Sequence, residues 1–462
     1  MESSRAAYLE SNQTLFLEEL CEFVSIPSVS ALPEHAGDVD AAADWLAARV
    51  EDAGFENVAQ LPTGGTPVVY GDWLHAPGRP TILLYGHYDV QPADPVESWD
   101  SPPFAPEVRD GRLYGRGASD NKGNLLAALI SLEAVLQADG SLPVNVKLFL
   151  EGEEEIGSPF SLGLLATEKE RLAADICVNA DGIQYGVGKP TILGSFRGMT
   201  GIEVTVQGPS SDVHSGIFGG TIHNPLHAMA RLVASFHDAD GRIAVEGFYD
   251  DVVPVGKEDR ERLGKAPFDE QEYIAGLDVD AVFGEAGYTT NERAWRRPTL
   301  ELNGLWGGFQ GEGSKTIVPS EAHAKVSCRL VANQDPGRIQ ELLEAHVAKH
   351  APPGVRVSVS RKRGLANPYL LPLDHPGVEA MADSYREIYD REPFYIGSGG
   401  TIPVTAAMLE ELGIYSLVFG FCTRDEQIHA PNEFFRLSSF ATAQKAFGIL
   451  IHKLAGIEFK KP

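Results

Sequence analysis

Two stretches of this chain alternate apolar runs of strand length with helical segments, and this pattern limits the folds open to it. The apolar runs lie at 81–90, 144–151, 175–180 and 194–199 in the first stretch, and at 414–421 in the second. Helical spacing of apolar residues occupies 15–24, 38–54, 121–136, 376–389 and 440–454, with Asp38 as a predicted N-cap. Such alternation predicts an α/β fold with a mostly parallel sheet covered by helices on both faces.

Between these stretches, from about residue 200, apolar and polar residues alternate one by one. The pattern covers 201–208, 324–331 and 355–362 and is typical of half-buried antiparallel strands, with a helix predicted at 226–236. The chain therefore predicts a discontinuous catalytic domain at 1–199 and 368–462, with an α+β domain inserted at 200–367. Residues from about 240 to 300 are polar and predict no element, and 396–403 predicts a glycine-rich turn before a helix.

The chain is acidic, with 65 Asp and Glu against 38 Lys and Arg and a formal net charge of −27 over 462 residues. A surface of this sign repels phosphate backbones, so we expect no nucleic-acid partner. No apolar run approaches the roughly 18 residues of a membrane-spanning helix, so we expect no membrane partner. The four cysteines lie far apart, and the first residues show no signal-peptide pattern. A soluble, cytoplasmic protein is expected.

Polar side chains follow several predicted strands at the points where the strands end. They are His87 and Asp89 after 81–85, Glu153, Glu154 and Glu155 after 144–150, Asp181 after 175–180, and His429 after 414–421. Asp120 begins a predicted helix on the glycine-rich connection 115–120. Taken singly, these residues have ordinary interpretations as a turn, a solvated acidic run or a helix N-cap. Because open α/β sheets bind ligands beyond the carboxyl ends of their strands, we expect the fold to bring them together.

As a set, these residues suit two divalent cations about 3.5–4 Å apart, which need one shared carboxylate and further imidazole and carboxylate ligands. The predicted ligand sets are His87, Asp120 and Asp181 for one ion, and Asp120, Glu155 and His429 for the other. Asp89 lies two residues from His87 and is placed to fix the imidazole tautomer. Glu154 stays free of metal and takes a proton from water. The residues alone do not decide which glutamate of the run has which role.

Eight blocks of the sequence follow one another in an order and spacing that resemble a known enzyme family. The blocks are GHYDV, GRGASDNKG, LEGEEEIGS, NADG, DVHSGIFGG, SCRLVANQ, GGTIPV and IHAPNE. They resemble the di-metal exopeptidases that include carnosinases, aminoacylases and desuccinylases, over nearly the whole chain from about Leu15. The blocks around DVHSGIFGG and RLVANQ are most similar to the carnosinase-like dipeptidase branch.

The resemblance implies a role for each candidate residue. The implied metal ligands are His87, Asp120, Glu155, Asp181 and His429, with Asp89 as the supporting acid and Glu154 as the general base. The inserted domain would be a lid and dimerisation domain. Its His214 would reach into the partner subunit's active site and polarise the scissile carbonyl.

The resemblance also implies how a substrate is held. Arg329 would bind the terminal carboxylate, which a planar guanidinium can contact in two places. Gly400 and Thr401 would offer a backbone donor and a hydroxyl. One position departs from the branch, because Ser398 stands where these dipeptidases commonly have an acidic residue. Ser398 leaves recognition of a free α-amino group open.

The expected function is metal-dependent hydrolysis of dipeptides that carry a free C-terminal carboxylate, by a hydroxide that bridges two divalent ions. Zinc is the expected metal, with manganese or cobalt as alternatives. The alternative function is that of an N-acyl-amino-acid deacylase with the same di-metal site. In either case we expect a small-molecule substrate and a homodimer formed through the inserted domain.

Overall fold

The computed structural model describes residues 2–460, which form two compact units. The first unit contains the chain up to Leu193, residues 371–395 and the chain from Ala407 onward. The second unit contains 194–370 and 396–406. The segments 194–199, 368–370 and 396–406 differ from the expectation, since the sequence pattern assigned them to the catalytic part and the structure assigns them to the second unit.

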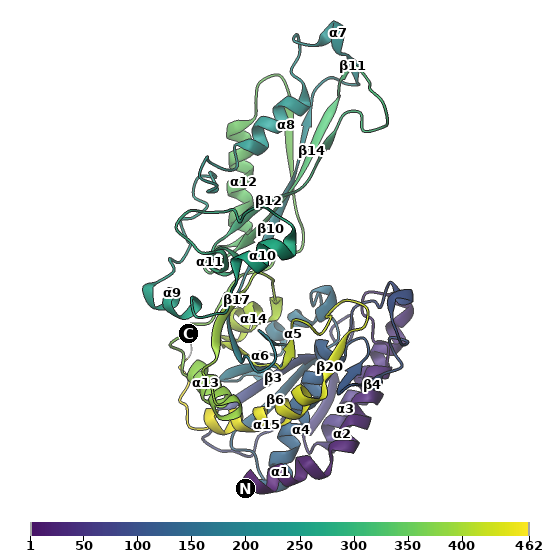
Figure 1. The fold of residues 1–462 in the computed structure, drawn as a ribbon, viewed down its shortest axis with the longest axis vertical. Helices are drawn as coiled ribbons and strands as arrows, with labels where there is room; N and C mark the ends of the chain where they lie inside the picture. Colours follow the sequence, from purple (N-terminus) through teal and green to yellow (C-terminus); the bar gives the residue numbers. More distant parts are fainter. Residues whose placement is uncertain (1, 461–462) are drawn as a thin grey trace. The chain divides into compact units, whose positions relative to one another are not determined.

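A six-stranded sheet forms the centre of the first unit, in the order β1-β2-β6-β3-β7-β18 (Figure 1). The strands are β1 (Glu56–Leu61), β2 (Val68–Trp73), β3 (Thr81–His87), β6 (Asn145–Glu151), β7 (Ile176–Asn179) and β18 (Ser416–Val418). The last four are parallel neighbours and match the predicted apolar runs, whereas β1 and β2 add an antiparallel edge that was not predicted. Since nearly all residues of β2, β3, β6 and β7 are buried, both faces of the predicted α/β sheet are covered.

Eight α-helices accompany this sheet among the described residues. They are α1 (Glu2–Ser11), α2 (Gln13–Ser25), α3 (Ala36–Asp52), α4 (Asn124–Asp139), α5 (Ser161–Thr167), α6 (Lys169–Leu172), α13 (Pro376–Tyr389) and α15 (Leu437–Leu454). Helix α4 is apolar and almost wholly buried, and it packs against α15 and α1 (Figure 1). The predicted N-cap Asp38 is wrong: α3 begins at Ala36, and the Asp38 carboxylate instead lies 2.7 Å from Nδ1 of His35.

Short strands form further small sheets. They are β16 (Tyr369–Leu370), β9 (Thr191–Phe196) and β17 (Phe394–Ser398) in one, β8 (Ile183–Gln184) and β19 (Cys422–Thr423) in another, and β20 (Phe434–Arg436), β5 (Arg112–Tyr114) and β4 (Glu107–Arg109) in a third. The run 194–199 therefore contributes to β9 rather than to the central sheet. Strand β17 also takes the first residues of the segment predicted as a turn, because its edge pairs with β9. The predicted helix after this segment is α14 (Pro403–Ala407).

An antiparallel sheet in the order β12-β14-β10-β15 forms the second unit's centre. Its strands are β12 (Thr299–Gly307), β14 (Glu321–Leu330), β10 (Gly198–Gln207) and β15 (Arg356–Arg361). Three of them match the predicted period-two runs, while β12 was not predicted. Helices α8 (Pro225–Ala234) and α12 (Pro336–His350) pack on one face around a core that includes Val204, Met229 and Leu343. Every second residue of β14 is buried, which explains the alternation in its sequence.

The remaining elements lie in loops of the two units. They are α7 (Ser215–Phe218), β11 (Val213–His214), β13 (Ile317–Val318), α9 (Lys257–Leu263), α10 (Glu270–Leu277) and α11 (Thr290–Arg296), with the short turns η1 (Pro33–His35), η2 (Val96–Ser98), η3 (Ala118–Gly123), η4 (Glu154–Ile156) and η5 (Met408–Leu412). Helices α9, α10 and α11 fill the stretch that predicted no element. Within residues 2–460, no helix combines the length and apolar character needed to cross a membrane. All four cysteines are free thiols.

Candidate metal centre and substrate-binding residues

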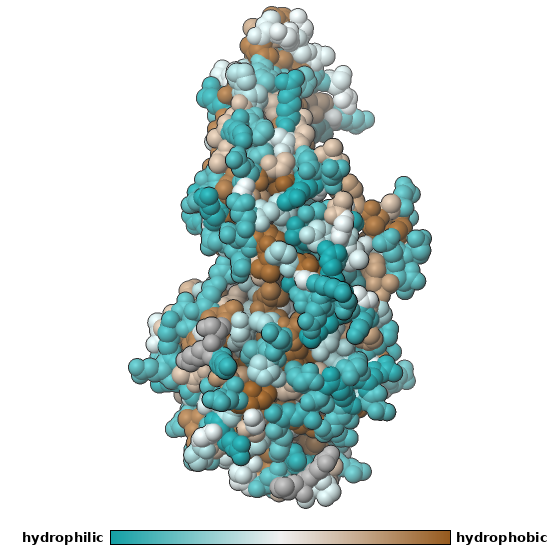
Figure 2. Space-filling model, turned by 90° about the vertical axis from the view of Figure 1, so that its left-hand side faces the viewer, coloured by the Kyte–Doolittle hydropathy of each residue, from teal (hydrophilic) through white to brown (hydrophobic). Residues whose placement is uncertain are grey.

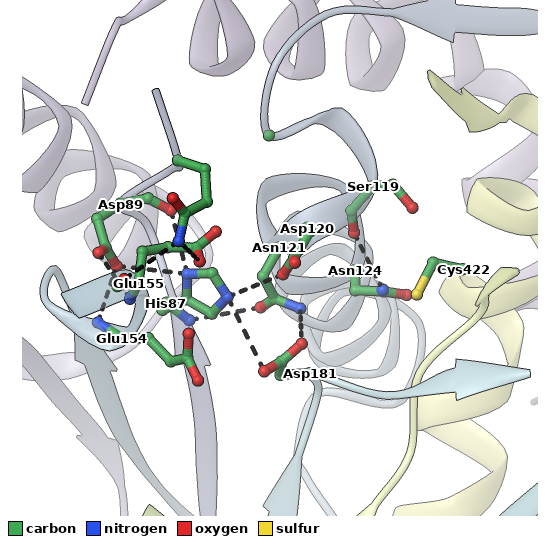
Figure 3. Close-up of polar contacts among 12 residues, drawn as sticks. His87, Asp89, Ser119, Asp120, Asn121, Asn124, Glu154, Glu155, Asp181 and Cys422 are labelled. Carbon is green, nitrogen blue, oxygen red and sulfur yellow. Dashed lines mark hydrogen bonds and ion pairs between the residues drawn. The ribbon is translucent and has the colours of Figure 1, made fainter. Parts of the chain in front are cut away.

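The acidic and imidazole side chains predicted at the strand ends come together in the first unit (Figure 3). His87 ends β3, Glu154 and Glu155 follow β6 on η4, and Asp181 follows β7. Asp120 lies on η3, directly before the buried helix α4. The ligand atoms of His87, Asp120 and Asp181 lie within 4.8 Å of one another, and so do those of Asp120, Glu155 and His429. The structure thus assembles the two predicted sets around one shared carboxylate.

Asp120 lies between the two imidazoles. Its Oδ1 is 3.1 Å from Nε2 of His87, and its Oδ2 is 3.0 Å from Nε2 of His429. Nε2 of His429 is also 3.2 Å from Oε2 of Glu155. Nε2 of His87 lies 3.9 Å from Oδ2 of Asp181. One oxygen of Asp120 therefore faces each group, as a bridging carboxylate requires.

Asp89 holds the ring of His87 from the opposite side. Both residues are completely buried, and Nδ1 of His87 lies 3.1 Å from the backbone carbonyl oxygen of Asp89 and 3.3 Å from its Oδ1. Because both neighbours are acceptors, Nδ1 carries the proton in the neutral ring, and the Nε2 lone pair faces Asp120. The predicted tautomer-fixing contact is thus present.

Asp89 also orders the glutamates that follow β6. Its Oδ1 accepts a hydrogen bond from the backbone N–H of Glu154 at 3.2 Å, and its Oδ2 accepts one from that of Glu155 at 3.1 Å. The hydroxyl of Ser30 donates to Oδ2 at 2.6 Å. A single buried carboxylate therefore positions His87 and both candidate glutamates.

The structure places the three glutamates of the acidic run in different surroundings. Glu153 is buried away from the cluster, where its carboxylate accepts from the backbone N–H groups of Thr66 at 2.8 Å and Phe160 at 3.1 Å. Glu155 belongs to the second ligand group, whereas Glu154 belongs to neither group. Figure 3 shows Glu154 beside the cluster on the side of His87. The alternatives that the sequence left open thus reduce to Glu154 and Glu155.

Burial, hydrogen bonds and neighbouring charges shift the pKa values in this cluster. Burial, together with the charge of Asp120, raises the pKa of Asp181 to about 7. Hydrogen bonds to Asp120 and Glu155 raise the pKa of His429 to about 10. Burial would raise the pKa of Asp120, but hydrogen bonds from His429 and His87 hold it well below its usual range. The field of the carboxylates therefore favours positive charge between them.

A buried glutamate that the pattern of strand ends did not single out holds the Asp120 turn. Glu433 is fully buried and accepts hydrogen bonds from the backbone N–H groups of Gly117, Ser119 and Asp120 at 2.9, 3.0 and 3.1 Å. Nη1 of Arg116 donates to it at 2.6 Å. This residue ends the IHAPNE block, which was its only signal in the sequence.

Glu426, three residues before His429, also contacts the turn that contains Asp120. It is fully buried and accepts from Oγ of Ser119 at 2.8 Å and from the backbone N–H of Thr423 at 2.9 Å. Glu426 and Glu433 flank His429, and both contact Ser119, the neighbour of Asp120. They therefore fix the loop of one candidate ligand against the turn of another.

The donor set fits divalent cations. Imidazole nitrogen and carboxylate oxygen are ligands of zinc and related metals. Oε1 of Glu155 is buried and has no hydrogen-bond partner among residues 2–460. A buried carboxylate oxygen without a donor is costly unless a cation or another donor reaches it. The cluster can thus accommodate two ions around Asp120.

The predicted substrate-binding residues lie in the second unit. Nη1 of Arg329 on β14 donates to Oγ1 of Thr401 at 3.0 Å. Gly400 N–H donates to Oγ of Ser398 at 3.0 Å, so the loop uses its own hydroxyl there. His214 ends β11 and is exposed, and its Nδ1 accepts from the N–H of Gly216 at 2.9 Å. Arg329 and Thr401 are thus brought together, while His214 lies in a separate part of this unit.

Comparisons with known proteins agree in family and fold. A model of the peptidase family M20/M25/M40 matches residues 83–453. The Cys-Gly metallodipeptidase of Schizosaccharomyces pombe is 30% identical over 97% of this chain and 97% of its own length. The human Beta-Ala-His dipeptidase is 32% identical over 97% of this chain and 92% of its own length. An M20 family metallo-carboxypeptidase from Sulfolobus solfataricus has a TM-score of 0.80 and 34% identity, covering 96% of this chain and 99% of its own. The chain belongs to the peptidase family M20/M25/M40.

Proposed function

We propose that this protein is a di-metal dipeptidase that cleaves the amide bond of dipeptides with a free C-terminal carboxylate. The observation that carries the proposal is the pair of candidate ligand groups that share Asp120, with the unligated Glu154 beside them. The similar Cys-Gly and Beta-Ala-His enzymes are named for dipeptide substrates, which supports the same class here.

In this proposal, His87, Asp120 and Asp181 hold one ion, and Asp120, Glu155 and His429 hold the other. Zinc is the expected metal because the ligands are imidazole and carboxylate groups, with manganese and cobalt as alternatives. When bound, the ions lower the pKa of a water molecule and polarise the scissile carbonyl.

The chain's own residues handle the protons and orient the groups. Glu154 takes a proton from the attacking water and returns it to the leaving amine. Asp89 keeps Glu154 in place through its backbone N–H and keeps the Nε2 lone pair of His87 directed at Asp120. His214 donates to the oxygen that becomes negative in the transition state. Arg329 binds the terminal carboxylate, with Gly400 and Thr401 beside it.

A second candidate function follows from Ser398. Its side chain is a hydroxyl that accepts from Gly400 N–H, so this position offers no carboxylate for a substrate's α-ammonium group. That chemistry favours substrates whose amine is acylated, as in an N-acyl-amino-acid deacylase. The two candidates share one metal centre and differ only at the amine end of the substrate.

One panel separates them: free dipeptides against their N-acetyl counterparts, each assayed with zinc, manganese and cobalt. A dipeptidase hydrolyses the free dipeptides with the higher kcat/KM, and a deacylase hydrolyses the acetylated compounds with the higher value. Hydrolysis of neither series with any metal would contradict the proposed function.

A cytoplasmic location remains a prediction of the sequence.

We also propose a homodimer formed through the inserted domain. Two apolar surfaces of the second unit support it. The edge strand β12 exposes Leu302 by 43% and Leu305 by 51%, and an unpaired apolar edge favours pairing with another chain. Around α7, Ile217 is 66% and Phe218 42% exposed, and Figure 2 shows brown, hydrophobic surface at this end of the unit.

Complementation tests whether His214 acts across the dimer. Inactive His214→Ala and inactive Glu154→Gln are mixed in equal amounts under conditions that allow subunits to exchange. One site of each mixed dimer then has an intact base and an intact partner histidine, so about a quarter of wild-type activity returns. Absence of recovery despite demonstrated exchange would show that His214 does not act in trans. A strictly monomeric protein would also exclude this arrangement.

A further inference from the structure

Two arginines of the second unit form one hydrogen-bonded group with the loop 399–401. Arg197 lies between β9 and β10, and Arg329 lies on β14. Both side chains are half-buried. The hydroxyl of Thr401 links them, because it donates to the backbone carbonyl of Arg197 at 2.5 Å and accepts from Nη1 of Arg329 at 3.0 Å.

Arg197 is fixed at its base and leaves its tip unused. Its backbone N–H donates to the carbonyl of Gly400 at 3.1 Å, and its Nε donates to the carbonyl of Gly399 at 3.2 Å. A Cβ added to Gly399 would lie 2.8 Å from Nη2 of Arg197, so the glycine lets the guanidinium approach closely. Within the described chain, neither Nη1 nor Nη2 of Arg197 has a hydrogen-bond partner.

The charge of this group is not balanced by the chain. Between residues 2 and 460, no carboxylate lies within ion-pair distance of Arg197 or Arg329. Burial, and then the charge of Arg329, lowers the pKa of Arg197 to about 10, while the charge of Glu301 opposes this shift. Two guanidinium groups that repel each other without an ion-paired carboxylate indicate an anionic ligand.

Other buried arginines of the protein are paired. Arg297 in the same unit contacts Glu285 through Nε at 2.7 Å and through Nη2 at 2.9 Å. Arg116 in the first unit contacts Glu433 at 2.6 Å. The unbalanced pair is therefore a local feature and does not reflect a general shortage of acidic residues in a chain of net charge −27.

We propose that Arg197 is a second substrate-binding arginine, which binds the substrate's terminal carboxylate together with Arg329. A carboxylate has two oxygens with about four acceptor sites, enough for Nη groups from both side chains. This inference rests on the proposed function, in which Arg329 alone had this role. A purely structural Arg197 would only hold the loop 399–401.

The test compares a free dipeptide with the same dipeptide amidated at its C-terminus. The wild type has the higher kcat/KM for the free acid, and Arg197→Gln lowers that value at least about tenfold while changing the amide little. Arg197→Lys keeps the positive charge but loses the Nε contact to Gly399, and it retains part of the preference for the acid. The matched control Arg297→Gln removes a paired arginine and leaves the ratio of acid to amide unchanged.

An equal loss for acid and amide in Arg197→Gln would overturn the proposal, because a loop-holding role affects both substrates alike. A binding measurement makes the result independent of turnover. Calorimetry in the inactive Glu154→Gln background, with N-acetylglycine and with N-acetylglycinamide, shows tighter binding of the acid, and adding Arg197→Gln removes the difference. If no dipeptide is hydrolysed, but the acid binds more tightly than the amide and Arg197→Gln abolishes this preference, the proposed function fails and the arginine site stands. Survival of the difference in Arg197→Gln excludes Arg197 from the site.

Discussion

The two units of the protein each contain a cluster of like charges, and the signs are opposite. The first unit gathers Asp120, Glu155 and Asp181 around two imidazoles, and the second gathers Arg197 and Arg329. Elsewhere, buried charges are mostly paired, as in the contact of Arg297 with Glu285. Because clustered like charges oppose folding unless something of the other sign joins them, each cluster indicates its ligand. The acidic cluster fits cations, and the basic cluster fits a carboxylate.

The two clusters also differ in support. The acidic cluster lies at the ends of parallel strands that are buried on both faces, and fully buried carboxylates hold its backbone, namely those of Asp89, Glu426 and Glu433. The basic cluster lies on a sheet with an exposed face and is linked by one hydroxyl, that of Thr401. We expect changes in the first cluster to affect metal binding and chemistry, and changes in the second to affect substrate preference.

The largest expected effect is that of replacing Glu154, the proposed general base beside the acidic cluster. Glu154→Gln keeps the shape of the side chain but cannot accept a proton, so kcat falls by about 10²-fold or more. Metal content stays at the wild-type level, because Glu154 lies outside both ligand groups. Steady-state kinetics and elemental analysis of the same preparation check both statements. Near-full activity would remove Glu154 from the mechanism.

Arg329→Ala tests the proposed role of the basic cluster. The substrate's carboxylate loses a half-buried guanidinium partner, which costs about 2 kcal/mol and lowers kcat/KM for a free-acid dipeptide roughly 30-fold. The amidated dipeptide loses much less, since it has no carboxylate to bind. As a control, Arg361→Ala removes an exposed arginine of β15, which is paired with Glu344 of α12, and keeps the preference for the free acid. An equal loss for acid and amide in Arg329→Ala would place Arg329 outside the site.

The support of the acidic cluster is tested by Glu433→Gln. The amide offers fewer acceptor sites to the N–H groups of the Asp120 turn, so the affinity for metal falls by about 10-fold to 100-fold, the range for residues that orient ligands. Metal titration with a competing chelator measures it. The matched control is Glu133→Gln, another buried glutamate bound by an arginine, Arg49, but away from the cluster. Equal metal affinity of Glu433→Gln and wild type would contradict the positioning role.

The sequence predicted the candidate ligands because of where they lie. His87, Asp181 and the glutamates of 153–155 directly follow apolar strands, and parallel strands end at the same edge of a sheet. Glu426 and Arg197 could not be predicted this way, since their roles depend on contacts with groups far along the chain. The carboxylate of Glu426, for example, accepts a hydrogen bond from the hydroxyl of Ser119, which lies 307 residues earlier in the chain.

In the fold, too, local sequence patterns predicted some elements and missed those that depend on tertiary contacts. The four parallel strands were predicted from continuous apolar runs, and β10 and β14 from their alternation. Strand β12 was missed because, as an exposed edge strand, it lacks that alternation. Asp38 was predicted as an N-cap, but the preceding turn Pro33–His35 starts the helix earlier. Tertiary pairing and neighbouring turns decide such positions, and local patterns do not contain them.

The smallest expected effect is a change in the pH dependence of stability, caused by His346 in the second unit. Burial, and then the charge of His350, lowers the pKa of His346 to about 4, below the ordinary histidine value of 6.5. The unfolded chain therefore binds this proton at a higher pH than the folded chain. The contribution of His346 to the free energy of unfolding is thus present above about pH 6.5 and is lost as the pH falls toward 4. The urea concentration at the unfolding midpoint of the wild type falls as the pH drops from 6.5 to 4, and that of His346→Gln falls less; an equal fall in both proteins would contradict this role of His346.

The central claim is that one carboxylate, Asp120, joins two cation sites. It is tested most directly by counting metal ions per chain in the wild type and in Asp120→Ala, with Glu154→Gln as the control that keeps its ligands. Elemental analysis after zinc loading and buffer exchange gives two ions for the wild type and for Glu154→Gln, and a loss from both sites in Asp120→Ala. Two ions per chain in Asp120→Ala would contradict the account, because neither site would then depend on Asp120.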